Sequence, residues 1–234
     1  MVAFEALRFL SWVERAYPNV DTAALRRASG LPAALDGEAR IGMEPVYALW
    51  GEAAAQTSDP GIGVRFAASS SFEDFGILGL AMMTCTTARE ALSRVHRYQH
   101  LLSTSGRWEI KERDGVTHVE WHRDGKRTLG HRLANETVLA ELVAGCRQLL
   151  GTVDPLAVAF RHPSPADTSE HRLFFRCPLR WSAPSDEVLL PSEILSRSPR
   201  GRCRPLLAQC MDERSCGRCS ANAQRRRCDR AQAH

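Results

Sequence analysis

FEDFGILGLAMMTCTTAREALSRVHRYQHLL, residues 72–102, is the stretch around which we expect the chain to fold. Its two phenylalanines are followed by two glycines, and each pair is three residues apart, so that each pair shares one side of a helical turn. Residues 76–85 are almost all apolar, which predicts a helix buried on most sides, with Gly76 and Gly79 admitting another backbone close by. This run is too short to span a bilayer.

Thr87 and Glu90 begin the second half of this stretch with the pattern of a capping box, in which each side chain bonds a backbone N–H that the helix leaves unpaired. Apolar residues then recur at intervals of three and four: Ala88, Ala91, Leu92, Val95, Tyr98 and Leu102. This spacing predicts a helix with one buried face and one face in water.

Further helices are predicted on both sides of this stretch. Before it, helices are expected over residues 4–16, 21–30 and 43–57, with a short one after Pro60; after it, over residues 131–150 and 167–176. The packing face predicted for the first helix consists of Phe4, Leu7, Leu10, Trp12 and Val13. Gly151 is well placed to end the long helix.

A hairpin is predicted where the apolar period changes from 3.6 to 2. Residues 107–113 and 116–122 alternate around Asp114-Gly115, a strong two-residue turn. The register that follows has an apolar face, formed by the pairs Trp108–Trp121 and Ile110–Val119, and a polar face with Lys111 opposite His118. With strands at 156–162, 179–182 and 187–190, the predicted fold class is α+β, with amino-terminal helices packed on a mostly antiparallel sheet of about five strands.

Charge and cysteine content divide the chain into two predicted parts. Residues 197–234 hold ten arginines, three acidic residues and five of the eight cysteines, and from Asp212 onward they contain no large apolar residue, so we expect a disordered tail. Residues 1–196 are slightly acidic and are expected to form the folded domain, which argues against a broad phosphate-binding face there. No stretch resembles a signal peptide or a membrane span, so a cytoplasmic protein is expected.

Signatures of catalysis and of metal binding are weak. The chain has no G-x-S-x-G, P-loop, H-E-x-x-H or dinucleotide fingerprint, so we predict no enzyme, no catalytic residue and no cofactor, with a small enzyme of unrecognised class as the alternative. His96 and His100 share the face of a helix that points to water, and no metal site is predicted. Cys216 and Cys219 leave open a zinc-binding tail that contacts nucleic acid, although nothing apolar is available to pack around it.

Adaptable side chains gather where the central helix is expected to meet the hairpin. Met82, Met83, Tyr98, Trp108 and Trp121 can line a pocket for an apolar ligand, or can be ordinary core. We therefore predict Met83, Tyr98, Trp108 and Trp121 as ligand-binding residues, with a small, partly apolar effector as the ligand.

Several motifs, taken in order, resemble the amino-terminal effector domain of AraC-type transcriptional regulators, in its long arabinose-binding-like form. They are Phe72-Glu-Asp-Phe75-Gly76-Ile-Leu-Gly79, Thr87-x-x-Glu90-Ala91-Leu92, Arg97-Tyr98, His162-Pro163-x-Pro165 and Leu173-Phe174-Phe175-x-Cys177-Pro178. The resemblance covers roughly residues 31–196. One departure is Asp186, where the family commonly has Asn at a local turn contact.

The resemblance implies a domain that senses a small molecule and forms a homodimer, while a separate domain with two helix-turn-helix motifs binds DNA. Residues 197–234 are too few to encode that second domain, and they follow a family-like course only to Arg214. We therefore expect a regulator that lacks its DNA-binding domain, in which the residues after about Arg214 arise from a shifted reading frame or from truncation of a full-length regulator. DNA is then a partner only through the missing domain.

Overall fold

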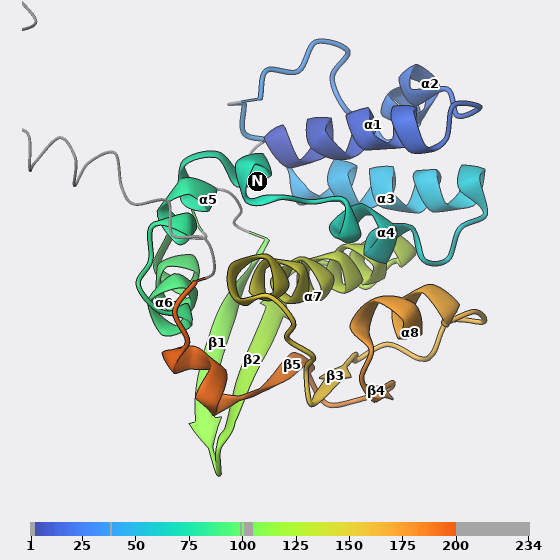
Figure 1. The fold of residues 1–234 in the computed structure, drawn as a ribbon. Coiled ribbons are helices and arrows are strands. Elements are labelled where there is room, and N and C mark those ends of the chain that lie inside the picture. Colours follow the sequence, from blue (N-terminus) through green and yellow to red (C-terminus); the bar gives the residue numbers. More distant parts are fainter. Residues whose placement is uncertain (1–2, 38, 99, 101–104, 200–234) are drawn as a thin grey trace, which may run out of the picture. The chain divides into compact units, whose positions relative to one another are not determined.

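Helices come first along the chain and the sheet follows, as predicted for an α+β fold (Figure 1). The computed structural model describes residues 3–37, 39–98, 100 and 105–199. The amino-terminal elements are α1 (Phe4–Ala16), α2 (Thr22–Ala28), α3 (Met43–Thr57), α4 (Ile62–Ala68), η1 (Phe72–Phe75), α5 (Gly76–Met83) and α6 (Ala88–Tyr98). They are followed by β1 (Gly106–Arg113), β2 (Val116–Arg123), α7 (Leu129–Leu150), β3 (Ala157–Ala159), α8 (Ser169–Phe175), β4 (Leu179–Arg180), β5 (Asp186–Pro191) and η3 (Ser192–Ser196).

The hairpin forms in the predicted register. Trp108 pairs with Trp121, Ile110 with Val119 and Arg113 with Val116, and the turn places Asp114 and Gly115 at positive φ. The sheet order is β1-β2-β5-β3-β4, in which only the β3–β4 pair is parallel. Trp108 and Trp121 are 8% and 5% exposed, so the predicted apolar face is indeed buried.

Helix α7 is the central element of the fold. The sequence suggested residues 72–102 for that position. Helix α7 lies between α1, α3 and α4 on one side and the sheet on the other (Figure 1). Leu133 and Ala134 belong to the core shared with α1 and α3, whereas Leu139 and Val143 belong to the core shared with the sheet. It begins two residues earlier than predicted, because the Thr128 hydroxyl accepts the His131 N–H at 3.2 Å.

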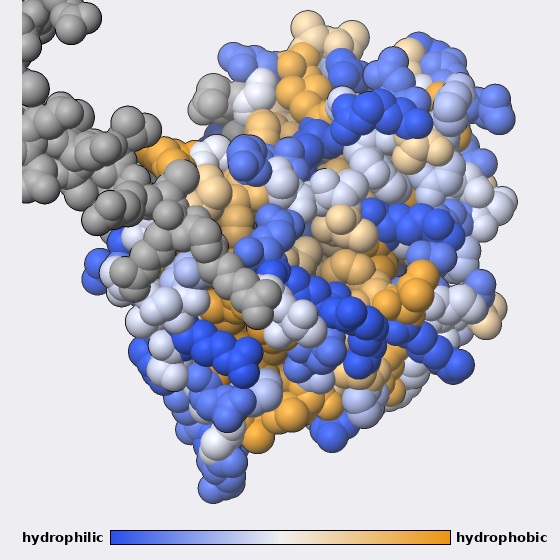
Figure 2. Space-filling model, viewed as in Figure 1, coloured by the Kyte–Doolittle hydropathy of each residue, from blue (hydrophilic) through white to orange (hydrophobic). Residues whose placement is uncertain are grey.

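The apolar run at α5 is less buried than predicted. Ile77 and Leu80 are 78% and 57% exposed, because α5 lies at the surface and packs through one face only. Figure 2 shows a largely hydrophilic face interrupted by hydrophobic patches. Gly79 does serve a close backbone approach, since a Cβ there would lie 1.7 Å from the Phe72 carbonyl oxygen, whereas Gly76 is needed for its positive φ.

Two other predicted helix features differ in detail. The Thr87 hydroxyl accepts the Glu90 N–H at 3.2 Å as expected, but the Glu90 carboxylate accepts the Thr86 N–H at 2.7 Å, so the reciprocal bond is displaced by one residue. In α1 the buried face is rotated from the predicted one: Phe4 is 37% exposed and Phe9 is buried. Phe9 stacks on Trp50 of α3 with ring centroids 3.8 Å apart, which fixes this orientation.

Three predicted strands are present with different lengths. β3 stops before Arg161 because the Arg161 N–H donates to the Asp186 carboxylate at 2.9 Å instead of to a neighbouring strand. In the described part of the chain, no helix is long and apolar enough to cross a membrane. From residue 200 on, the predicted basic tail with its cysteines lies outside the described residues, so disorder and zinc binding there remain predictions.

Candidate functional site

A cavity of about 200 Å³ lies between the helices and the β1–β2 hairpin. Residues of α1, α3, α5, α6 and α7 line it on the helical side, and residues of β1, β2 and β5 on the sheet side. Most of its lining is apolar, and includes Trp50, Phe66, Phe72, Leu78, Met82, Leu92, Val95, Trp108, Trp121, Val138, Leu142 and Leu149. Cavities of this composition are the usual sites of small-molecule binding.

Small residues on the facing helices leave this space open. Ala88 and Ala91 of α6, and Ala134 and Gly145 of α7, all line the cavity. A Cβ on Gly145 would lie 3.8 Å from the Phe72 ring, which is ordinary contact, so that glycine leaves room rather than permitting a close crossing. Val138, Leu142 and Cys146 of α7 are only partly buried because these side chains face the cavity.

Two tryptophans form part of the wall on the sheet side. The rings of Trp108 and Trp121 lie with centroids 4.8 Å apart, and the Arg123 guanidinium lies 5.4 Å from the Trp121 ring. The Trp121 indole N–H is buried and has no hydrogen-bond partner among the described residues. Buried donors are normally paired, so this N–H is a candidate group for binding a ligand acceptor.

The α1 side of the cavity carries charged groups. Arg8 forms an ion pair with Glu141 of α7, and the Ser70 hydroxyl donates to the same carboxylate at 3.2 Å. Glu5 also lines the cavity. The pKa of Glu5 is raised to about 7, mainly by burial and to a smaller extent by the negative charge of Glu141. The cavity is therefore amphipathic, with one charged region in an apolar space.

Of the four predicted ligand-binding residues, two line the cavity and two do not. Trp108 and Trp121 line the cavity, as does Met82. Met83 is partly buried against the adjacent core and is absent from the lining, because successive helical residues point about 100° apart. Tyr98, at the end of α6, is 39% exposed and is also absent from the lining. Contact of Met83 and Tyr98 with a ligand remains a prediction.

Four charged residues of the cavity were missed by the sequence reasoning: Glu5, Arg8, Arg123 and Glu141. Glu141 carried a signal, because it falls between Val138 and Gly145 on the stripe that faces the cavity. A charged residue inside an apolar stripe marks a buried polar contact. Glu5 and Arg8 carried no such signal, since the face of α1 that they occupy was predicted to be exposed.

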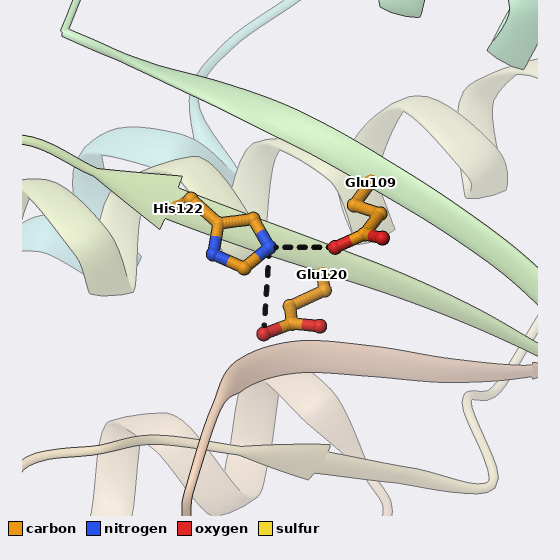
Figure 3. Close-up of side chains that lie close together, drawn as sticks. All are labelled: Glu109, Glu120 and His122. Carbon is orange, nitrogen blue, oxygen red and sulfur yellow. Dashed lines mark hydrogen bonds and ion pairs between the residues drawn. The ribbon is translucent and has the colours of Figure 1, made fainter.

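The polar face of the hairpin holds a second cluster, shown in Figure 3. His122 Nε2 lies 3.0 Å from Glu109 Oε2 and 3.5 Å from Glu120 Oε1, and the three ligand atoms could hold a metal ion. Lys111 Nζ lies 2.8 Å from Glu109 and supplies positive charge there. Hydrogen bonds from Lys111 and His122 lower the pKa of Glu109. The arrangement is therefore explained as an ion-pair network of the sheet surface.

Glu136 of α7 is fully buried between two histidines. Its two carboxylate oxygens lie 3.2 Å from His162 Nε2 and 3.2 Å from His171 Nε2. Burial is the main influence on the pKa of His162 and lowers it. This contact gives the His162-Pro163 motif a structural role, since it ties the loop after β3 to α7 through a buried acid.

Asp186 makes the turn contact expected of the family's Asn. Its Oδ1 accepts the Arg161 N–H at 2.9 Å, and its Oδ2 accepts from Asn135 Nδ2 at 3.0 Å. Burial raises the pKa of Asp186, with the Arg161 N–H opposing the rise. Both carboxylate oxygens act as acceptors here, one for the Arg161 N–H and one for the Asn135 amide, so Asp186 makes a local turn contact with two acceptor atoms where an amide side chain would offer one.

The fold surrounds a largely apolar cavity that is partly open to solvent, an arrangement typical of small-molecule-binding domains. The chain belongs to the AraC transcription regulators, because residues 20–198 match the model of their amino-terminal arabinose-binding domain.

Among solved structures, the chain resembles the transcriptional regulator CdpR from Pseudomonas aeruginosa, with a TM-score of 0.59 and 19% sequence identity. That match covers 84% of this chain and 57% of the other, so the chain spans little more than half the length of that regulator. An Fe(II) H-NOX protein from K. algicida matches with a TM-score of 0.48 and 13% identity, over 63% of this chain and 82% of the other. No curated protein sequence matches the chain.

Proposed function

We propose that this domain senses a small, partly apolar effector that binds in the cavity between α7, α6 and the hairpin. The observation that carries the proposal is the cavity itself, about 200 Å³ of mostly apolar space in the middle of the fold. Empty space of this size is costly in a protein interior, because its walls lose van der Waals contacts. A ligand that fills it recovers those contacts and stabilises the folded state.

The cavity is suited to sensing because it touches several elements at once. Val95 of α6, Trp108 of β1 and Leu142 of α7 all line it, although they are far apart in the sequence. A ligand that contacts all three can shift the positions of α6 and the hairpin relative to α7. Such a shift is the kind of change that a regulator passes to another domain or subunit.

In the function that we propose, effector binding controls transcription through a homodimer. DNA recognition is assigned to a helix-turn-helix domain of the kind that the family carries, and not to the domain described above. A regulator of this type acts in the cytoplasm, where its operator DNA is found. The family match and the cavity support this assignment.

A matched pair of variants tests binding in the cavity. Leu142→Phe adds volume to a side chain in the lining, whereas Leu156→Phe makes the same change at a side chain that is 46% exposed and outside the lining. Thermal shift is measured with amino acids, fatty acids, sugars and apolar amines, and any hit is confirmed by quenching of tryptophan fluorescence. We expect at least one compound to raise Tm in the wild type and in Leu156→Phe but not in Leu142→Phe. Equal shifts in both variants would place the ligand elsewhere and refute the proposal.

A further inference from the structure

We propose that the effector carries a protonated amine on an apolar body, and that the ammonium group pairs with Glu5. The inference rests on the proposed function, since it names the class of ligand that the same cavity takes. It depends on which charged groups in the cavity already have partners.

Glu5 is the acid that remains available in the lining. It forms no hydrogen bond or ion pair with any other described residue, and its side chain is partly accessible although it lies inside the fold. Glu141, the neighbouring acid, is already engaged by Arg8 and by the Ser70 hydroxyl. A carboxyl group that lies beside an apolar cavity, and that accepts no hydrogen bond from the described residues, can bind a hydrogen-bond donor of a ligand.

The basic groups of the lining are already committed. Arg8 pairs with Glu141, and its guanidinium lies 4.6 Å from the Phe66 ring and 4.8 Å from the Phe75 ring. Arg123 donates from Nε to the Asn135 side chain at 2.5 Å and from its terminal nitrogen to the Ala134 carbonyl at 3.0 Å. An incoming carboxylate would have to break these contacts and would meet two acids. An ammonium group would meet the positive charges of Arg8 and Arg123, but it would find in Glu5 a carboxyl group that no described residue hydrogen-bonds.

Glu5 lies outside the part of the chain that matches the family model. The family model covers residues 20–198, and α1, which carries both Glu5 and Arg8, precedes that segment. The match to the family therefore assigns no role to Glu5. Its place in the cavity is decided by the packing of Phe9 against Trp50, which orients α1.

Titration of Glu5 gives the proposal a second signature. Burial and Glu141 raise its pKa to about 7, while Arg8 and Arg123 oppose the rise. An alkyl ammonium group remains charged between pH 6 and pH 8, because its pKa is about 10. Binding requires ionised Glu5, so affinity for an amine is expected to rise about tenfold over that range as the fraction of ionised Glu5 rises.

Three probes of similar size and different charge test the ligand class: phenethylamine, phenethyl alcohol and phenylacetate. Dissociation constants are measured at pH 6 and at pH 8 by calorimetry for the wild type, for Glu5→Gln and for Glu14→Gln, a control at an exposed acid on the same helix. Circular dichroism and the Tm without ligand show whether each variant folds. We expect the amine to bind at least about tenfold more tightly than the alcohol in the wild type and in the control, and Glu5→Gln to remove both this preference and its pH dependence.

Each other outcome overturns the amine proposal. If phenylacetate binds most tightly, or if Glu5→Gln keeps the preference for the amine, the cavity is still a ligand site and the proposed function stands without Glu5. If the three probes all fail to bind at about 10 mM, the amine proposal is wrong, and the proposed function is decided by the Leu142→Phe comparison over the wider panel.

Discussion

Replacing Gly130 by alanine should strongly destabilise the domain, although alanine is the better helix former. Gly130 lies in the first turn of α7, where that helix crosses α3, and a Cβ added there would lie 1.7 Å from the Tyr47 carbonyl oxygen and 2.6 Å from its carbonyl carbon. Ordinary contact needs about 3.5 Å, so the two helices would have to separate by about 2 Å. Tyr47 is 2% exposed and its ring packs on His131, and this packing would be lost.

The magnitude follows from the comparison of two opposing effects. Alanine in a helix is favoured over glycine by about 1 kcal/mol at an interior position and by less in the first turn. Overpacking a core typically costs about 1–3 kcal/mol and occasionally more, and a clash of a Cβ with a backbone carbonyl belongs at the upper end of that range. For a domain of this size, Gly130→Ala is therefore expected to lower Tm by about 6–12 °C.

Gly145 provides the matched control in the same helix. An added Cβ there would meet only the Phe72 ring, at 3.8 Å, so Gly145→Ala should leave stability unchanged or raise it by up to about 1 kcal/mol. Thermal and urea unfolding are followed by circular dichroism at 222 nm. If both substitutions raise Tm, the close crossing of α3 and α7 is absent and the reasoning is refuted.

Three further predictions concern buried charge, pH and the exposed face of α5. Glu136→Ala should cost about 3–5 kcal/mol in urea unfolding because buried His171 and half-buried His162 lose their acid, whereas Glu193→Ala, at an acid that is 76% exposed, should change stability by less than about 0.5 kcal/mol. Burial lowers the pKa of His131 to about 4, so its stabilising effect is present above pH 6.5 and lost as pH falls toward 4. His131→Gln should therefore reduce the loss of stability over that range by about 1–3 kcal/mol, and an unchanged pH profile would contradict this. Ile77→Ser should leave Tm unchanged, since that side chain is 78% exposed, and a large fall would show that α5 packs through this side chain.

Features that depend on near neighbours in the chain were predictable from the sequence. The Asp114-Gly115 turn and the alternation on both sides of it determine the pairing of Trp108 with Trp121, because a two-residue turn leaves one register open. The helix predicted from Asp21 onward begins there, because the Asp21 carboxylate accepts the Ala23 and Ala24 N–H groups at 2.9 and 3.0 Å. The α+β class follows from the order of such local patterns.

The candidate site was predictable only in part, because a cavity is the space that distant elements leave between them. Trp108 and Trp121 were found because their register places them on the buried face, but Met82 and not Met83 lines the cavity, and periodicity alone does not set that rotation of α5. The ion pair of Arg8 with Glu141 joins residues 133 positions apart.

By itself, the sequence determined the elements, the hairpin register and the family, since these depend on short-range hydrogen bonding and on motif order. Only the tertiary structure decided that α7 is the centre of the fold and that Glu5 faces the cavity. The physical reason is that the packing of Phe9 on Trp50 orients α1, and that contact joins two helices whose relative placement is not set by local pattern. Burial in that packed setting, together with the charge of Glu141, then moves the pKa of Glu5 to about 7.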